Sequence, residues 1–371
     1  MDTPETPGAG SAESGFVRER QEQWEVERLS PLASLSAQTK GRLIPEPRDA
    51  LRTEFQRDRD RVIHTNAFRR LKHKTQVFVA PIGDHFVTRL THTLEVTQIA
   101  RTIARSLRLN EDLAEAAALG HDVGHTPFGH IGEQVLDSLH PGGFRHNEQS
   151  LRTVDILEKD GAGLNLTHET RQAILRHSKP RGDFLNADEL DELTLEAQVV
   201  RVSDAIAYLA HDIGDAIRAG VLGESDLPSD AREVLGTRHS QRLDSMVNDI
   251  VASSWACAGY DSLAPDGRRP RLSMSPQVTS VVTQLREFMF DNVYVPAGDG
   301  AEGKNARVIV EFLYGHFLKN PGDIPEHYFL RNDPVDRVAL DYIAGMTDQF
   351  ALHTAEGLRP GIASDVFVGR V

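Results

Sequence analysis

The chain has 371 residues and a net charge of −14, with 39% hydrophobic and 26% charged residues. These proportions are typical of globular proteins and exclude a fibrous repeat or a wholly disordered chain. The negative charge also excludes a protein that coats nucleic acid through its overall charge, although it leaves room for a local basic site.

No targeting or membrane segment is expected. No apolar run approaches the roughly 18 residues that cross a bilayer, and residues 1–15 lack the basic-then-apolar layout of a signal peptide. The single cysteine, Cys257, cannot form an intramolecular disulfide, which is typical of a reducing compartment. We therefore expect a soluble cytoplasmic protein that does not contact a membrane.

In chain order, the expected elements are nearly all helices. Residues 1–15 contain too few apolar side chains to offset the entropy of ordering, so a disordered tail is expected. Apolar residues then recur at three- and four-residue spacing, which is typical of amphipathic helices. The segments with this spacing are 88–108, 111–121, 147–158, 168–177 and 188–218. Asn110 is a suitable N-cap for the second of them.

The C-terminal half continues this pattern with more interruptions. Helices are expected near 278–292 and 307–319 and from about Pro334 to His353. Clusters of Pro, Gly, Asp and Arg predict loops at 222–241, at 261–277 and in PAGDGAEGKNA, residues 296–306. The only strand candidates are Thr75 to Val79 and Val293 to Val295. The predicted fold class is therefore all-α, with a core at 16–220 and a helical C-terminal portion, 221–371, packed on it.

A basic run stands out in this acidic chain. Between Arg52 and Lys74 there are eight Lys or Arg and three Asp or Glu. The run predicts either a solvated helix face or a site for a small anion such as a polyphosphate.

Histidines are concentrated in one region. Nine of the 16 fall within residues 64–146: His64, His73, His85, His92, His121, His125, His130, His140 and His146. Histidine is the commonest metal ligand and the side chain that most readily moves protons near neutral pH.

The order of residues in and after this cluster predicts a metal site. His92, the adjacent pair His121 and Asp122, and the distant Asp204 all fall in helical segments. They can converge if the helices pack side by side, as in bundles that build internal metal sites. A mixed nitrogen and oxygen set suits divalent magnesium, manganese, iron, cobalt or zinc and does not choose among them.

The run HDVGHTPFGHIGE, which begins at His121, adds candidates for acid–base chemistry. Glu133 lies three residues after His130, so on a helix its carboxylate can contact that imidazole and raise its basicity. His125 could donate to a phosphate oxygen. The following HNEQSLR segment adds His146, although an ordinary helix cap would also account for it.

These segments together resemble the HD-domain phosphohydrolases, and within them the deoxynucleoside triphosphate triphosphohydrolases of the dGTPase-like branch. The matching motifs are DRDRVIHTNAFRRLKHKTQVF, RLTHTLEV, GHDVGHTPFGHIGE, HNEQS and SDAIAY. They cover about residues 47 to 216, and more loosely 278–319. The resemblance implies an HD-domain helical bundle that hydrolyses a dNTP, such as dGTP, to a deoxynucleoside and inorganic triphosphate with a divalent metal ion.

The resemblance also implies residue roles. It assigns the metal to His92, His121, Asp122 and Asp204, and acid–base catalysis to His130 and Glu133. It assigns the phosphates to His125, His146 and Arg89, and the deoxyribose to Gln76, Tyr208 and Asp212. Some relatives respond to a second nucleotide or assemble as homo-oligomers, so an allosteric nucleotide and a homo-oligomer are further expectations.

Two alternatives remain open at this point. The metal quartet alone also suits another HD enzyme, such as a phosphodiesterase or an alarmone hydrolase. The second alternative is a protein that senses nucleotides or binds single-stranded nucleic acid with weak catalysis; such binding would depend strongly on salt.

Overall fold

A computed structural model describes residues 12–77, 86–178, 185, 190–260, 269–329, 331–363 and 367. The predicted all-α fold is confirmed, because the described residues form helices and only two isolated β-bridges, Arg42 with Thr167 and Thr75 with Thr88. Residues 1–11 of the expected tail and His85 lie outside the described residues, and residues 12–15 of that tail belong to the first helix.

Sixteen α-helices are described. They are α1 (Ala12–Arg28), α2 (Glu54–Ile63), α3 (Asn66–Arg70), α4 (Arg89–Ser106), α5 (Glu111–Gly120), α6 (His130–Leu139), α7 (His146–Arg152), α8 (His168–Arg176), α10 (Leu195–Arg218), α11 (Ser229–Val234), α12 (His239–Ser253), α13 (Pro276–Met289), α14 (Val295–Asp299), α15 (Ala301–Lys319), α16 (Val335–Ala344) and α17 (Asp348–Leu358). Two π-helical segments, Thr153–Leu157 and Phe290–Tyr294, continue α7 and α13.

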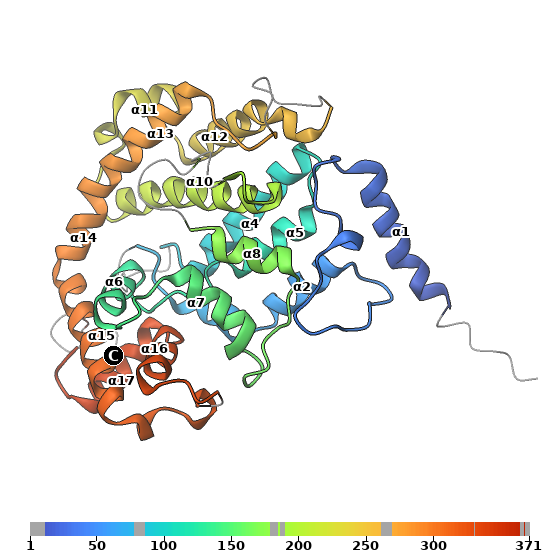
Figure 1. The fold of residues 1–371 in the computed structure, drawn as a ribbon. Helices are drawn as coiled ribbons and strands as arrows, with labels where there is room; N and C mark the ends of the chain where they lie inside the picture. The colour runs from blue at the N-terminus through green and yellow to red at the C-terminus, as the bar shows by residue number, and fades with distance from the viewer. Residues whose placement is uncertain are drawn as a thin grey trace, which may run out of the picture.

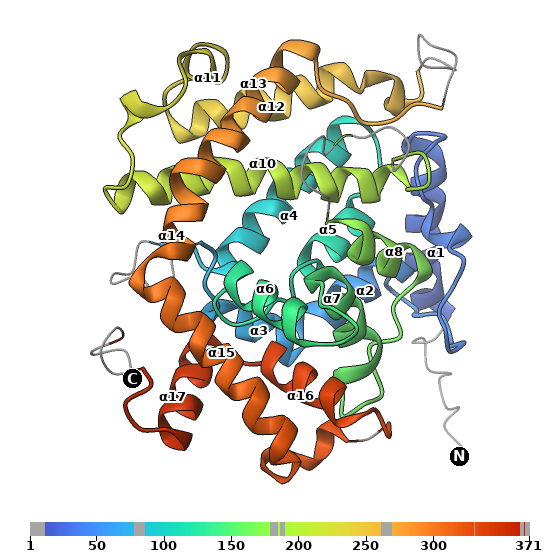
Figure 2. The ribbon, with the colours of Figure 1, turned by 60° about the vertical axis from the view of Figure 1, so that its left-hand side comes forward.

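The long helix α10 runs through the middle of the molecule (Figures 1 and 2). It contacts α4, α5 and α8 on one side and α12 on the other, while α11 and α13 pack against each other at the same end of the molecule as α12. At the opposite end, α15 packs against α6, α16 and α17. Residues that are far apart in sequence therefore meet around α4, α5, α6 and α10.

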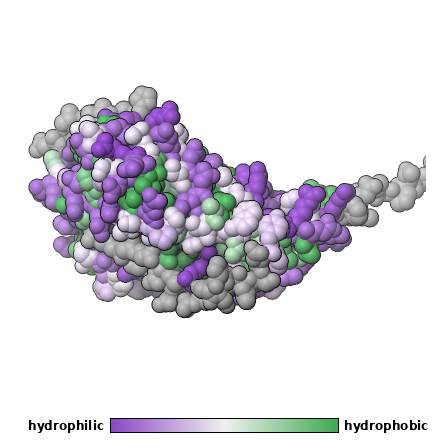
Figure 3. All heavy atoms as spheres, turned by 90° about the horizontal axis from the view of Figure 1, so that it is seen from above, coloured by the Kyte–Doolittle hydropathy of each residue, from purple (hydrophilic) through white to green (hydrophobic). Residues whose placement is uncertain are grey.

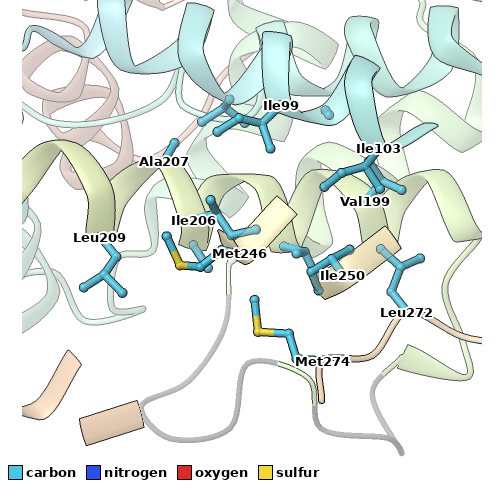
Figure 4. Close-up of a cluster of buried hydrophobic side chains, with 14 of the residues drawn as sticks. Ile99, Ile103, Val199, Ile206, Ala207, Leu209, Met246, Ile250, Leu272 and Met274 are labelled. Atoms are coloured by element: carbon cyan, nitrogen blue, oxygen red, sulfur yellow. The ribbon is translucent and has the colours of Figure 1, made fainter. Parts of the chain in front are cut away.

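The largest apolar cluster explains why α10 is central. Helix α10 carries apolar residues on nearly all of its sides, which is the pattern of a buried helix. Figure 4 shows side chains of α4, α10 and α12 meeting in this cluster, among them Ile99, Ile103, Val199, Ile206, Met246 and Ile250. Each is almost fully buried, and burial of one such side chain stabilises the fold by roughly 1.5–3 kcal/mol.

A second apolar cluster joins the C-terminal helices to the region that carries the histidines. Phe128 and Leu136, near and in α6, pack with residues of α15 and α16 such as Leu313 and Val338. The C-terminal helices therefore support the turn that precedes α6.

Several local predictions differ from the structure. The expected loop at 222–241 contains α11 and the start of α12, and the expected loop at 296–306 contains most of α14 and the start of α15. The strand expected at Val293 to Val295 is helical. The helix expected from Pro334 to His353 is divided into α16 and α17. The Asn110 cap is confirmed, since its side chain accepts from the Leu113 amide at 3.2 Å.

The apolar side chains gather in the interior. The face seen from above is mostly hydrophilic, with small hydrophobic patches (Figure 3). None of the described helices combines the length and the hydropathy that a membrane crossing requires.

Candidate active site

Four predicted ligands converge from three helices. His92 lies in the first turn of α4, His121 and Asp122 follow the end of α5, and Asp204 lies in α10. His92 Nε2 lies 3.2 Å from Asp204 Oδ1, and His121 Nε2 lies 3.9 Å from the same oxygen and 3.7 Å from Asp122 Oδ2. One atom from each of His92, His121 and Asp204 fits within 4.8 Å of the others. This spacing lets the atoms surround a single ion.

Hydrogen bonds orient both imidazoles toward this centre. His121 Nδ1 donates to the Ala118 carbonyl at 2.6 Å, and its buried Nε2 has no hydrogen-bond partner among the described residues. His92 Nδ1 lies 2.7 Å from His211 Nε2, so His92 Nε2 is left facing Asp204. An imidazole held through one nitrogen, with the other facing carboxylates, is the usual arrangement of a metal ligand. The residues therefore fit a divalent cation.

The charges of the site also fit a cation. Burial lowers the pKa of His92 to about 4, so its ring is neutral near pH 7, as a metal ligand must be. Burial opposes ionisation of Asp122, but Arg89 and the neighbouring imidazoles hold the pKa of Asp122 well below its ordinary value. Arg89 Nη1 donates to Asp122 Oδ2 at 2.5 Å.

Two glycines allow the tight turns around the site. Gly124 donates its amide to Ser150 Oγ, and a Cβ at Gly124 would lie 2.1 Å from the Ser150 nitrogen. Gly129 has φ of +59°, and a Cβ there would approach the Gln76 carbonyl and Arg89 Nη2 at 3.2 and 3.3 Å. Glycine at 129 therefore lets the start of α6 approach these two residues.

The predicted acid–base pair forms at the start of α6. His130 Nδ1 lies 3.2 Å from Glu133 Oε2, and the His130 side chain is 49% exposed. The other Glu133 oxygen accepts from the His146 backbone amide at 2.9 Å and lies 2.8 Å from His146 Nδ1. Burial opposes ionisation of Glu133, but His146 and His130 lower the pKa of Glu133 well below its ordinary value. A carboxylate therefore faces the exposed imidazole near neutral pH.

His125 lies beside this pair. Its Nδ1 accepts from the Thr126 amide at 3.0 Å, so in the neutral ring Nε2 carries the proton. That Nε2 is buried, has no hydrogen-bond partner among the described residues and lies 3.8 Å from Glu133 Oε2. Burial and Arg89 lower the pKa of His125 well below its ordinary value. His125 is therefore a neutral donor.

The predicted substrate-binding residues fall into two groups, Arg89 with Gln76 and Tyr208 with Asp212. Arg89 and Gln76 are buried, and Arg89 Nε and Nη2 and Gln76 Oε1 have no hydrogen-bond partner within the described part of the chain. The Tyr208 ring lies 6.1 Å from the His130 ring. Asp212 is fully buried, with one oxygen 2.8 Å from His211 Nδ1 and the other accepting from the Tyr294 hydroxyl at 2.8 Å.

Four residues that the sequence did not single out as site residues contact the predicted site residues or the turn before α6. His177 Nε2 lies 3.2 Å from His146 Nε2, and His211 holds His92. Lys74 donates to the carbonyls of His125 and Ala344, and Asp348 accepts from the Phe128 amide. His211 had a usable signal, since it lies seven residues after Asp204 and thus on the same helix face. Lys74 lies within the motif DRDRVIHTNAFRRLKHKTQVF but was considered only as part of the basic run, and His177 and Asp348 lie outside the motifs.

The basic run divides into two parts. Its N-terminal arginines are engaged in ion pairs, Arg52 with Asp49, Arg57 and Arg61 with Glu46, and Arg59 with Asp112. These four are therefore structural. Arg69, Arg70 and Lys74 line a cleft between α3 and residues 327–345, and Lys72 is exposed.

The sequence is similar to known proteins over most of its length. The sequence matches the HD domain family over residues 89–209 and the phosphohydrolase-associated domain family over residues 272–356. Proteins described as deoxyguanosinetriphosphate triphosphohydrolase-like are 51% identical in Caldanaerobacter subterraneus subsp. tengcongensis, 48% in Desulfatibacillum aliphaticivorans and 46% in Clostridium perfringens strain SM101. These matches cover 91, 91 and 90% of this chain and 94, 96 and 95% of the relatives. The chain belongs to the deoxyguanosinetriphosphate triphosphohydrolase-like family of HD-domain proteins.

Proposed function

We propose that this protein hydrolyses a deoxynucleoside triphosphate, dGTP or another dNTP, to a deoxynucleoside and inorganic triphosphate. The observation that carries the proposal is the acid–base group of His130, Glu133 and His146 beside a set of side chains that fits a divalent cation. Hydrolysis of a phosphate ester can use both parts, the cation as a Lewis acid and the imidazole–carboxylate pair for proton transfer. The family relationship supports the specific reaction.

His92, His121, Asp122 and Asp204 would hold the ion. When bound, a divalent cation polarises a phosphoryl oxygen and lowers the pKa of a coordinated water. Two imidazoles and two carboxylates do not select the metal ion among magnesium, manganese, iron, cobalt and zinc.

His130 is assigned the proton transfer to the leaving 5′-oxygen. Its ring is half exposed and can reach a bound substrate, while Nδ1 faces the Glu133 carboxylate. A proton on Nδ1 held by Glu133 leaves Nε2 to exchange a proton with the substrate. General acid–base catalysis of this kind contributes roughly 10²–10⁴ in rate.

Buried donors are assigned to the triphosphate and the sugar. The unpaired edge of Arg89 and the Nε2 proton of His125 suit phosphate oxygens, because charged and neutral donors fixed in a buried site need no reorganisation. Gln76, Tyr208 and Asp212 are assigned to the deoxyribose, and Asp212 also faces His211 Nδ1. A second nucleotide and a homo-oligomer stay predictions of the family resemblance, and binding of single-stranded nucleic acid stays an alternative.

Three variants test the roles of the two parts. His130→Ala is expected to reduce kcat at least 100-fold while the bound metal, measured by elemental analysis, is unchanged. His121→Ala is expected to lose both metal and activity. His353 is exposed in the middle of α17, so the control His353→Ala should change neither the bound metal nor the activity. Normal activity in the His130 variant would refute its assignment.

A further inference from the structure

Tyr294 lies in an unusual backbone element beside the candidate active site, although the sequence did not single it out as a site residue. It is the last residue of the π-helical segment Phe290–Tyr294, which joins α13 to α14. Such π-helical turns are rare, and they occur frequently at functional sites. Here the turn brings the Tyr294 ring to within 5.4 Å of the Tyr208 ring of α10.

The Tyr294 hydroxyl holds a buried carboxylate of α10. It donates to Asp212 Oδ2 at 2.8 Å. Because the Asp212 side chain is fully buried, both of its oxygens need partners within the protein. The other oxygen, Oδ1, lies 2.8 Å from Nδ1 of the neighbouring His211. The carboxylate therefore lies between a hydroxyl of the C-terminal region and an imidazole of α10.

The contacts continue from His211 to one of the proposed metal ligands. The Asp212 carboxylate attracts the proton of a neutral His211 ring to Nδ1, which leaves a lone pair on His211 Nε2. That Nε2 lies 2.7 Å from His92 Nδ1, so His92 carries its proton on Nδ1 and keeps the lone pair on its own Nε2. His92 Nε2 in turn faces Asp204 at 3.2 Å, on the side of the proposed cation.

Burial makes each of these contacts matter to the next one. The side chains of His92, His211 and Asp212 are all buried, so water does not readily replace a partner that is removed. A His92 ring with its proton on Nε2 would donate to Asp204 instead. That tautomer cannot bind a cation, because a ligating imidazole nitrogen must have its lone pair free. The contacts from Tyr294 to His92 therefore select the tautomer that binds metal.

We propose that Tyr294 is a positioning residue for the metal centre, whose hydroxyl acts through Asp212 and His211 to keep the His92 lone pair directed at the cation. The inference rests on the metal site of the proposed function. It extends that function by giving a role in the metal site to the region that matches the phosphohydrolase-associated domain, residues 272–356. Mutation of an outer-shell partner typically weakens metal binding by about 10–100-fold. Because Tyr294 acts through two residues, the lower end of this range is expected.

The test is competition for Mn²⁺ between the full-length protein and a fluorescent chelator, without nucleotide, so that the result does not depend on turnover. The wild type is compared with Tyr294→Phe, with His211→Phe and with the double variant. The matched control is Tyr314→Phe, since the Tyr314 hydroxyl also lies 3.1 Å from an imidazole nitrogen, His140 Nδ1, which is outside the proposed metal site. Thermal unfolding followed by circular dichroism shows whether each variant is folded.

The proposal predicts that Tyr294→Phe weakens Mn²⁺ binding about 10-fold and that Tyr314→Phe leaves it unchanged. In the His211→Phe background, Tyr294→Phe should cause no further loss, because the contact with His92 is already absent there. A purely structural role would weaken binding equally in both backgrounds, so additive losses would overturn the proposal.

Two other outcomes would also overturn it, and they differ in what they say about the metal site. If Tyr294→Phe bound Mn²⁺ as tightly as the wild type, the metal site would stand and only the role of Tyr294 would fail. If the wild type bound no Mn²⁺, the metal site of the proposed function would fail together with this inference.

Discussion

Asp348 links the C-terminal helices to the active-site turn, and its removal is expected to destabilise both. Its buried carboxylate accepts from the Phe128 amide and the Thr75 amide, each at 2.9 Å, and from the Thr75 hydroxyl. Phe128 has φ of +60° and directly precedes Gly129 and His130. Asp348→Ala leaves two buried amides without an acceptor at about 1–3 kcal/mol each, so the free energy of unfolding should fall by about 2–6 kcal/mol.

A graded series makes this prediction specific. Asp348→Asn keeps one acceptor oxygen and loses the other, so it should cost about half as much. Glu302→Ala removes an exposed acid from the first turn of α15 and should cost less than about 1 kcal/mol. Urea unfolding followed by circular dichroism measures all three. A loss below about 1 kcal/mol for Asp348→Ala, or equal losses for the two Asp348 variants, would refute the reasoning.

Two further predictions concern buried bases. Burial lowers the pKa of Lys74 to about 7, whereas in the unfolded chain it is roughly 10.4. Between these values unfolding takes up a proton, so wild-type stability should rise with pH by up to about 1.4 kcal/mol per unit relative to Lys74→Met. If the free energy of unfolding in urea changed equally with pH in the wild type and in Lys74→Met, this pKa would be contradicted. His211→Phe removes the partner of His92 Nδ1 and should weaken metal binding about 10–100-fold in competition with a chelator, with His353→Phe as control; unchanged affinity would show that His211 does not hold the ligand.

Helices with strong local signals were predictable from sequence. The spacing of apolar residues in α4, α5 and α8 is a property of each segment alone, and the Asn110 cap is next to the helix that it caps. These helices could therefore be predicted without information on tertiary contacts. The prediction of a loop at 296–306 was wrong because its glycines were assumed to interrupt a helix. A Cβ at Gly303 in α15 would lie 2.3 Å from the Gly298 carbonyl oxygen of α14. That glycine permits close packing, which composition alone cannot distinguish from a turn.

The candidate site was predictable as far as its motifs extend. The motifs name residues that the structure brings together, such as His92 and Asp204 from α4 and α10. The supporting contacts depend on packing between distant segments. Asp348 lies 220 residues after Phe128 in the chain, so no local spacing could have connected them.

The central claim is that the protein releases intact tripolyphosphate from a dNTP. Purified protein with Mn²⁺ or Mg²⁺ is incubated with each dNTP singly and with their mixture, and products are separated by ion-pair chromatography. The account predicts deoxynucleoside and tripolyphosphate in equal amounts. Release of pyrophosphate or single phosphates, or no product under any of these conditions, would contradict it.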